Sequence, residues 1–203
     1  MRTLKPKIPG VSLNHIVPTP ESELLTGVPI FFGLAKVNNK VDNNEPKKLT
    51  LRTQFDQYFS QIEGNQGEGY LKNAIKGFFE NGGRLCYVVA LENNSLDALK
   101  QALEASELLE NTDLICVPDI MVGSNADEVI KMQQAVLEHC EYMGNRFAIL
   151  DALNVNDVEK LDWQRKEFSS HYGALYAPWL KVENRPDFIP PCGHVAGIYA
   201  SSD

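Results

Sequence analysis

Two aspartates are the residues of this sequence best placed for chemistry. Asp119 follows the apolar run 114–118, and Asp151 follows the apolar run 147–150. Ligands of open parallel sheets bind beyond the carboxyl ends of the strands, where two neighbouring carboxylates suit a divalent metal or a shared proton. The alternative is that each acid caps the loop or helix after it, because strand ends commonly carry Asp in turns. No Asp-x-Ser-x-Ser or other companion ligand follows either acid.

A glycine-rich run at residues 64–69 raises the question of phosphate binding. A phosphate loop leaves a strand and opens a helix, so that its backbone N–H groups meet the anion. This run instead follows an expected helix, and the sequence holds neither Gly-x-x-x-x-Gly-Lys-Ser/Thr nor Gly-x-Gly-x-x-Gly. A turn between two helices explains these glycines, and we expect no nucleotide cofactor.

Two further residue groups are weak candidates for a zinc site or a nucleophile. His139-Cys140 and Cys192-Gly193-His194 contain zinc-ligand types, but Cys140 lies on an apolar helical face, where a free cysteine behaves as a small hydrophobe. Ser169-Ser170-His171 lacks the Gly-x-Ser-x-Gly turn that would present a nucleophile. We therefore expect no cofactor, no metal and no catalytic residue in these groups.

The segment 172–199 is rich in aromatic residues, glycine and proline. Aromatic side chains that carry a polar group are enriched at protein interfaces. Tyr176, Pro178 and Trp179 are therefore expected to take part in protein contacts rather than in catalysis.

The elements that would position these residues alternate along the chain. Apolar runs of strand length are expected at residues 28–34, 85–91, 114–118, 147–150 and 174–177. Apolar spacings of three and four indicate helices between them. Their apolar positions lie within 51–62, 71–78, 96–103, 129–143 and 158–168, with Ser95 and Ser124 or Asn125 as caps.

This alternation predicts the fold class. Short apolar strands that are separated by helices imply parallel strands buried on both faces and joined by right-handed crossovers. We expect an α/β fold with a doubly wound, mainly parallel sheet flanked by helices, and with residues 85–91, 114–118 and 147–150 in one sheet.

The first 26 residues have a different character from the remainder. They hold four of the eleven prolines, which remove donors that a helix or a central strand needs. We expect an extended N-terminal arm over 1–26 and an α/β domain over 27–203. The arm is expected to become a strand only when a neighbour offers an open sheet edge.

Composition narrows the classes of partner. The formal net charge is -8, and no Lys/Arg run exceeds two residues, which argues against nucleic acid. No apolar stretch is long enough for a transmembrane helix, and the first residues lack the apolar run of a signal peptide. The four cysteines are far apart in sequence, as expected of reduced thiols in a cytoplasmic protein.

Five motifs, in the same order along the chain, resemble those of contractile tail sheath proteins. They span nearly the whole sequence, and residues 25–29 and 114–121 look most like those of phage-tail-like injection systems. The motifs are Ile8-Pro9-Gly10-Val11, Gly77-Phe78-Phe79-Glu80-Asn81-Gly82-Gly83 with Cys86-Tyr87-Val88-Val89, Arg146-Phe147-Ala148-Ile149-Leu150-Asp151, Ala174-Leu175-Tyr176-Ala177-Pro178-Trp179 and Pro190-Pro191-Cys192-Gly193-His194-Val195-Ala196-Gly197.

The resemblance implies a non-enzymatic structural subunit. Such subunits stack as hexameric rings around an inner tube protein, contact neighbouring sheath subunits, and shorten to drive the tube through a target envelope. The expected location is an assembled cytoplasmic particle, a virion tail or an injection apparatus, without direct membrane insertion. Candidate contact residues are Ile8, Pro9, Gly10 and Val11 in the arm and Tyr176, Pro178 and Trp179 in the body.

The resemblance differs at the carboxyl end. Sheath sequences usually continue from the Gly-His-Val-Ala-Gly helix into a long C-terminal domain, so a fragment or a short relative is expected. Two alternatives stay open on the sequence alone. One is a regulator or cap of sheath assembly, and the other is a small metal-dependent α/β enzyme that uses Asp119 and Asp151.

Overall fold

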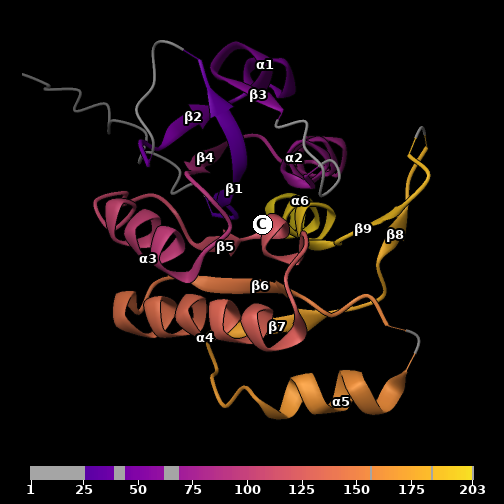
Figure 1. Ribbon diagram of the computed structural model, residues 1–203. Helices are drawn as coiled ribbons and strands as arrows, with labels where there is room; N and C mark the ends of the chain where they lie inside the picture. The colour runs from indigo at the N-terminus through magenta and orange to yellow at the C-terminus, as the bar shows by residue number, and fades with distance from the viewer. Residues whose placement is uncertain (1–25, 39–43, 62–68, 156, 184, 203) are drawn as a thin grey trace, which may run out of the picture.

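The computed structural model describes residues 26–38, 44–61, 69–155, 157–183 and 185–202 (Figure 1). Nine strands lie in these ranges: β1 Pro29–Val37, β2 Lys47–Leu49, β3 Phe59–Gln61, β4 Cys86–Leu91, β5 Leu114–Cys116, β6 Phe147–Asp151, β7 Gly173–Tyr176, β8 Leu180–Lys181 and β9 Phe188–Ile189. The helices are α1 Phe55–Tyr58, α2 Leu71–Glu80, α3 Leu96–Ala105, α4 Ala126–Met143, α5 Val158–Lys166 and α6 Cys192–Ser202, with 3-10 turns η1 Arg52–Gln54 and η2 Pro118–Met121.

A seven-stranded sheet organises the molecule. Its order is β2-β4-β1-β5-β6-β7, and β3 pairs with the end of β1. The pairs β1 with β4, β1 with β5, β5 with β6, and β6 with β7 are parallel. The α/β expectation is confirmed, as is the placing of β4, β5 and β6 in one sheet.

Helices cover both faces of this sheet, because successive strand residues point to opposite sides. Ile30 and Phe32 of β1 belong to the apolar cluster that includes α3 and α4. Phe31, between them, belongs to the cluster that includes α2 and α6. All three side chains are fully buried. The sheet is thus doubly wound, with β1 at its centre.

The strand order reverses at β1. The connection through α2 leads from β1 to β4 on one side, and the connection through α3 returns to β5 on the other side. The carboxyl ends of β1 and β5 therefore flank a topological switch point, the usual ligand position in such sheets.

One expected helix is wrong in part. Residues 51–62 form η1 and the single turn α1, after which the chain turns into β3. Antiparallel pairing of β3 with Ala35–Val37 of β1 supplies backbone partners that a continued helix would forgo. Phe55 and Phe59 still reach the core, with ring centroids 5.4 Å apart. The apolar spacing therefore found buried residues but assigned them to the wrong element.

The remaining helix expectations are confirmed with shifts at their ends. Ser95 caps α3, and Asn125 caps α4 in a reciprocal capping box with Glu128. Helix α5 ends before Phe168. It lies beyond α4 and β7, at the end of the molecule (Figure 1).

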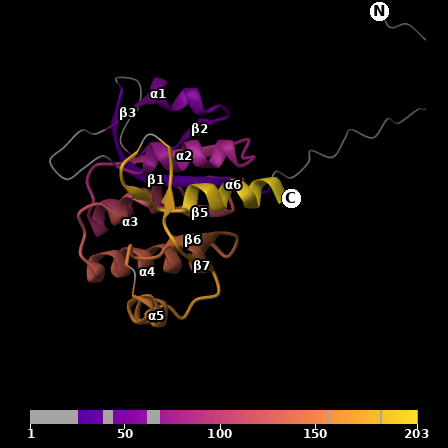
Figure 2. The same cartoon turned by 90° about the vertical axis from the view of Figure 1, so that its right-hand side faces the viewer.

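The hairpin of β8 and β9 was not anticipated from the sequence. It connects the main sheet to α6, whose carboxyl end lies at the margin of the body (Figure 2). No helix within the described residues is both long and apolar enough to cross a membrane. The expected arm, apart from Thr26, lies outside the described residues.

Candidate functional site

Asp119 occupies the switch point of the sheet. It lies in η2, directly after β5, and is fully buried. One carboxylate oxygen accepts the backbone N–H of Leu34 in β1 at 2.6 Å. The other accepts the N–H groups of Tyr70 and Leu71, at the start of α2, at 2.5 and 3.0 Å. The acid therefore caps α2, a helix that precedes it by about fifty residues.

This arrangement fills the place where a doubly wound fold would bind an anion. Helix N-termini bind phosphates through free N–H groups, and at α2 these groups are held by Asp119. A side-chain carbon on Gly33 would lie 2.7 Å from the same carboxylate, and one on Gly69 would lie 3.2 Å from it. Both glycines thus let the backbone close around Asp119, while residues 64–68 of the glycine-rich run lie outside the described residues.

Asp151 plays a similar part at the next strand end. One of its oxygens accepts the N–H of Cys192, the first residue of α6, at 2.8 Å. Its other oxygen has no hydrogen-bond partner among the described residues. Burial raises the pKa of Asp151 to about 7, an effect that the contacts with Cys192 partly offset. Burial likewise raises the pKa of Asp119 to about 6, although the three N–H bonds to its carboxylate lower the pKa in part.

The two aspartates thus act as helix caps, each on a helix distant from it in sequence. The described residues contain no group of three or more His, Cys, Asp or Glu side chains that could hold a metal ion. The hydrogen bonds that Asp119 accepts within the described ranges come from backbone N–H donors. The metal-dependent alternative therefore finds no ligand set in the described part of the chain.

The other residues singled out for zinc or nucleophilic chemistry are dispersed. Cys140 is buried on α4, and His194 of α6 lies over Gly77 of α2. Ser170 accepts a hydrogen bond from the N–H of Tyr172, as in a turn. All four cysteines are buried and free.

His139 belongs to a buried polar cluster that the sequence did not reveal. Its Nε2 lies 2.8 Å from a guanidinium nitrogen of Arg146, a residue only 2% exposed. Arg146 also donates to the hydroxyl and carbonyl oxygens of Ser106 and to the carbonyl oxygen of Leu109. Burial and the charge of Arg146 lower the pKa of His139 to about 4, so the imidazole accepts from Arg146 while neutral.

Trp179 and Tyr176 lie close to the same strand ends. The indole N–H of Trp179 donates to the carbonyl oxygen of Ala152 at 2.6 Å, just beyond β6. Its ring meets Tyr70 edge to face, with centroids 5.3 Å apart. The hydroxyl groups of Tyr176 and Tyr199 are 2.8 Å apart. Pro178 is exposed and follows a cis peptide bond.

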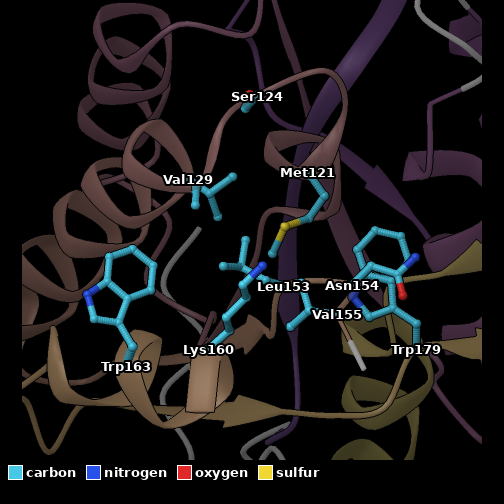
Figure 3. Close-up of a pocket in the computed structure, with 10 residues that line it drawn as sticks. Met121, Ser124, Val129, Leu153, Asn154, Val155, Lys160, Trp163 and Trp179 are labelled. Atoms are coloured by element: carbon cyan, nitrogen blue, oxygen red, sulfur yellow. The ribbon is translucent and has the colours of Figure 1, made fainter. Parts of the chain in front are cut away.

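A pocket of about 510 Å³ opens beside Trp179 (Figure 3). Its walls come from the segments after β5 and β6, from the first turns of α4 and α5, and from the segment after β7. The lining residues are Met121, Ser124, Ala126, Val129, Leu153, Asn154, Val155, Lys160, Trp163 and Trp179.

Of these lining residues the sequence indicated only Trp179 as a contact residue. Trp163 had a usable signal, because it is an aromatic residue in the mostly charged and polar sequence of α5, and it is 40% exposed. Lys160 and Met121 had none, since they become neighbours only through the crossovers of the sheet. Ile8, Pro9, Gly10 and Val11 lie outside the described residues.

Comparisons with known proteins give a consistent fold. No family model and no curated protein matches the chain. A chain in the six-fold symmetrised baseplate of the anti-feeding prophage matches 98% of this chain with a TM-score of 0.67 and 19% identity, over 53% of its own length. One in the contracted helical sheath of the same particle matches 98% with a TM-score of 0.63 and 18% identity, over 53% of its own length.

A third match comes from another particle. A chain in the contracted sheath complex of the extracellular contractile injection system PVC matches 99% of this chain, with a TM-score of 0.62, 20% identity and 52% of its own length covered. At these identities the likeness establishes a shared fold. The chain spans about half the length of the solved chains that it matches, and its fold is that of a part of contractile injection system proteins.

Proposed function

We propose that the chain is a structural subunit of a contractile sheath, in a phage tail or a phage-tail-like injection system, and that it catalyses no reaction. The observation that carries this proposal is the match of nearly the whole chain to chains from a contracted helical sheath and from a contracted sheath complex. The five ordered sheath-like motifs of the sequence support it independently.

The described site fits this role better than it fits catalysis. The carboxylate of Asp119 fills the switch point with three backbone bonds, so the customary ligand position of the fold serves packing. Asp151 likewise holds the start of α6. The surface around Trp179 is apolar and recessed, which suits a protein contact.

The proposed partners are neighbouring sheath subunits and an inner tube protein. The arm residues Ile8, Pro9, Gly10 and Val11 and the body residues Tyr176, Pro178 and Trp179 would contribute contacts to neighbouring subunits. Assembly would take place in the cytoplasm as part of a particle. A net charge of -8 makes nucleic acid an unfavourable partner.

Co-sedimentation tests this function. The tagged chain is expressed together with the products of its neighbouring genes, and particles are separated on a density gradient and viewed by negative-stain microscopy. We expect the chain to travel with tube-containing particles. The folded Asp119→Asn variant should travel with them as well, because the proposed function needs no catalytic carboxylate. A chain that remains at the top of the gradient when such particles form would contradict the proposal.

A further inference from the structure

The pocket beside Trp179 combines an apolar wall with one basic group. Its lining includes Met121, Val129 and Leu153 together with the side chain of Lys160, which reaches toward Leu153 (Figure 3). No acidic side chain lines the pocket among the described residues. Within the same part of the chain Lys160 forms no ion pair. Such a site selects an apolar side chain that has a carboxylate beside it.

Another surface segment of this chain carries the groups that such a pocket would bind, an exposed apolar side chain with acidic residues beside it. Leu108 is 91% exposed, more than any other large hydrophobic residue in the described ranges. Glu107 and Glu110 flank it in sequence, while Leu109 turns inward and packs against the core. We refer to residues 107–110 as the acidic knob.

The acidic knob is held rigidly. A turn joins the N–H of Leu109 to the carbonyl oxygen of Ser106 at 3.1 Å. The carbonyl oxygen of Leu109 accepts from Arg146 at 3.2 Å and from the Thr112 hydroxyl at 3.1 Å. Because the buried Arg146 holds the carbonyl oxygen of Leu109, the backbone of the turn is already ordered. Docking of Leu108 would therefore lose little backbone conformational entropy.

The knob and the pocket lie at opposite ends of the parallel sheet. The knob precedes the amino end of β5, whereas the pocket follows the carboxyl ends of β5 and β6. One copy cannot therefore fill its own pocket with its own knob. A contact between two different patches of identical chains is head to tail, and it continues into rings or helical arrays rather than closing as a dimer.

We propose that the acidic knob of one copy docks into the pocket of the next, with Leu108 against the apolar wall and Glu107 or Glu110 near Lys160. The partner of the pocket is then a second copy of this chain. The inference rests on the proposed sheath function, in which identical subunits repeat. Leu108 supplies the apolar anchor. The charges set the register, since copies with a net charge of -8 otherwise repel one another.

Cysteine cross-linking tests the contact directly. The natural cysteines are all buried, so introduced surface cysteines react alone. Two single variants, Glu110→Cys in the knob and Asn154→Cys in the pocket, are mixed under mild oxidation. We expect a mixed disulfide-linked pair at roughly tenfold the yield obtained with Tyr142→Cys, an exposed α4 control, in place of Asn154→Cys. Equal yields would overturn the proposal.

Association measurements provide a second readout. Leu108→Asp removes the knob and Lys160→Glu impairs the pocket, and both positions are exposed, so the fold should persist. By sedimentation velocity at high protein concentration, each variant alone should lose the self-association of the parent chain. Their mixture should form pairs only, because one intact knob and one intact pocket remain.

Charge reversal distinguishes the proposed contact from a general loss of solubility. Adding Glu107→Lys and Glu110→Lys to the Lys160→Glu chain itself should restore its self-association, because every knob and every pocket then carry opposite charges again. Failure of this rescue, together with negative cross-linking, would reject the contact. The proposed sheath function is tested separately by the density gradient. It would stand if the chain still travels with tube particles, and it would be rejected if the chain does not.

Discussion

Asp119 joins three segments of this fold that lie far apart in the sequence. Its carboxylate links the end of β1, the turn after β5 and the start of α2 through three backbone bonds. The sequence marked Asp119 as important because it ends an apolar strand, but the same signal fits a metal ligand and a cap. Its partners decide between these roles, and they come from residues up to 85 positions away.

Replacing Asp119 with Ala should destabilise the fold by about 3 kcal/mol or more, because three N–H groups lose their acceptor in a buried site. Urea unfolding monitored by circular dichroism measures the change. Glu141→Ala, which removes an exposed acid from α4, should change the free energy of unfolding by less than about 0.5 kcal/mol. A similar small loss for both variants would show that the cap is unimportant.

His139 should make stability depend on pH. Its pKa is lowered to about 4 in the folded chain, so between pH 6.5 and 4 the unfolded chain binds a proton that the folded chain resists. The free energy of unfolding should therefore fall as the pH falls, by roughly 2 kcal/mol between pH 8 and pH 5 from this group. Asp151, with its raised pKa, acts in the opposite direction over pH 7 to 4.

Comparison with His139→Gln isolates the histidine contribution, since Asp151 is the same in both chains. The stability of the parent chain relative to the variant should decrease as the pH is lowered from 8 to 5. A constant difference in the free energy of unfolding across this range would mean that His139 titrates normally in the folded chain.

At the scale of elements, the parallel strands and long helices could be predicted because both signals are local. Strands β4, β5 and β6 are continuous apolar runs, and α4 carries its own capping box. The structure of segment 51–62 could not be predicted in this way, because β3 exists only through its pairing with β1. The hairpin of β8 and β9 is similar, since two strands of two residues each are too short to show a periodicity.

The contact between α2 and α6 depends on glycine. A side-chain carbon on Gly193 would lie 2.2 Å from the carbonyl oxygen of Ala74 and 2.4 Å from its Cα. Gly193→Ala should therefore push the helices apart and cost about 2 kcal/mol or more in thermal or urea unfolding. Ile198→Ala, at a 54% exposed position of the same helix, should cost less than about 1 kcal/mol. Equal costs would contradict this packing.

The N-terminal segment offers a prediction about assembly rather than stability. Near the start of the described residues, the N–H groups of Gly27 and Val28 donate to the Asp113 carboxylate at 2.7 and 2.6 Å. Because these bonds remain, deletion of residues 1–25 should leave the unfolding midpoint unchanged. If Ile8-Pro9-Gly10-Val11 contacts neighbouring subunits as proposed, the shortened chain should leave tube-containing particles in the gradient. Undiminished co-sedimentation would reject this role of the segment.

At the scale of the whole molecule, charge opposes self-assembly of the isolated chain. A net charge of -8 makes identical copies repel at low salt. We expect the chain alone to remain a monomer or small oligomer at moderate concentration and to associate more as salt is added. Light scattering and electron microscopy measure this, and long ordered tubes formed by the bare chain at low salt would contradict it.

The functional interpretation could be drawn from sequence only through ordered motifs, since no single residue carries a chemical signature. The pocket beside Trp179 was inaccessible to such reasoning, because its lining comes from several segments between residues 121 and 179. The exposed Leu108 was equally hidden. Two leucines between two glutamates are compatible with an ordinary helix end, and only the structure shows that Leu108 is exposed while Leu109 packs inward.

Gold labelling of native particles tests the central proposal most directly. Injection-type particles are purified from the cells that produce this protein, and a tag on the chain is located by electron microscopy. The proposed sheath function predicts gold at regular intervals along the full length of the shaft, drawn closer together in contracted particles. Gold at one end only would identify a cap, and unlabelled particles would contradict the sheath function.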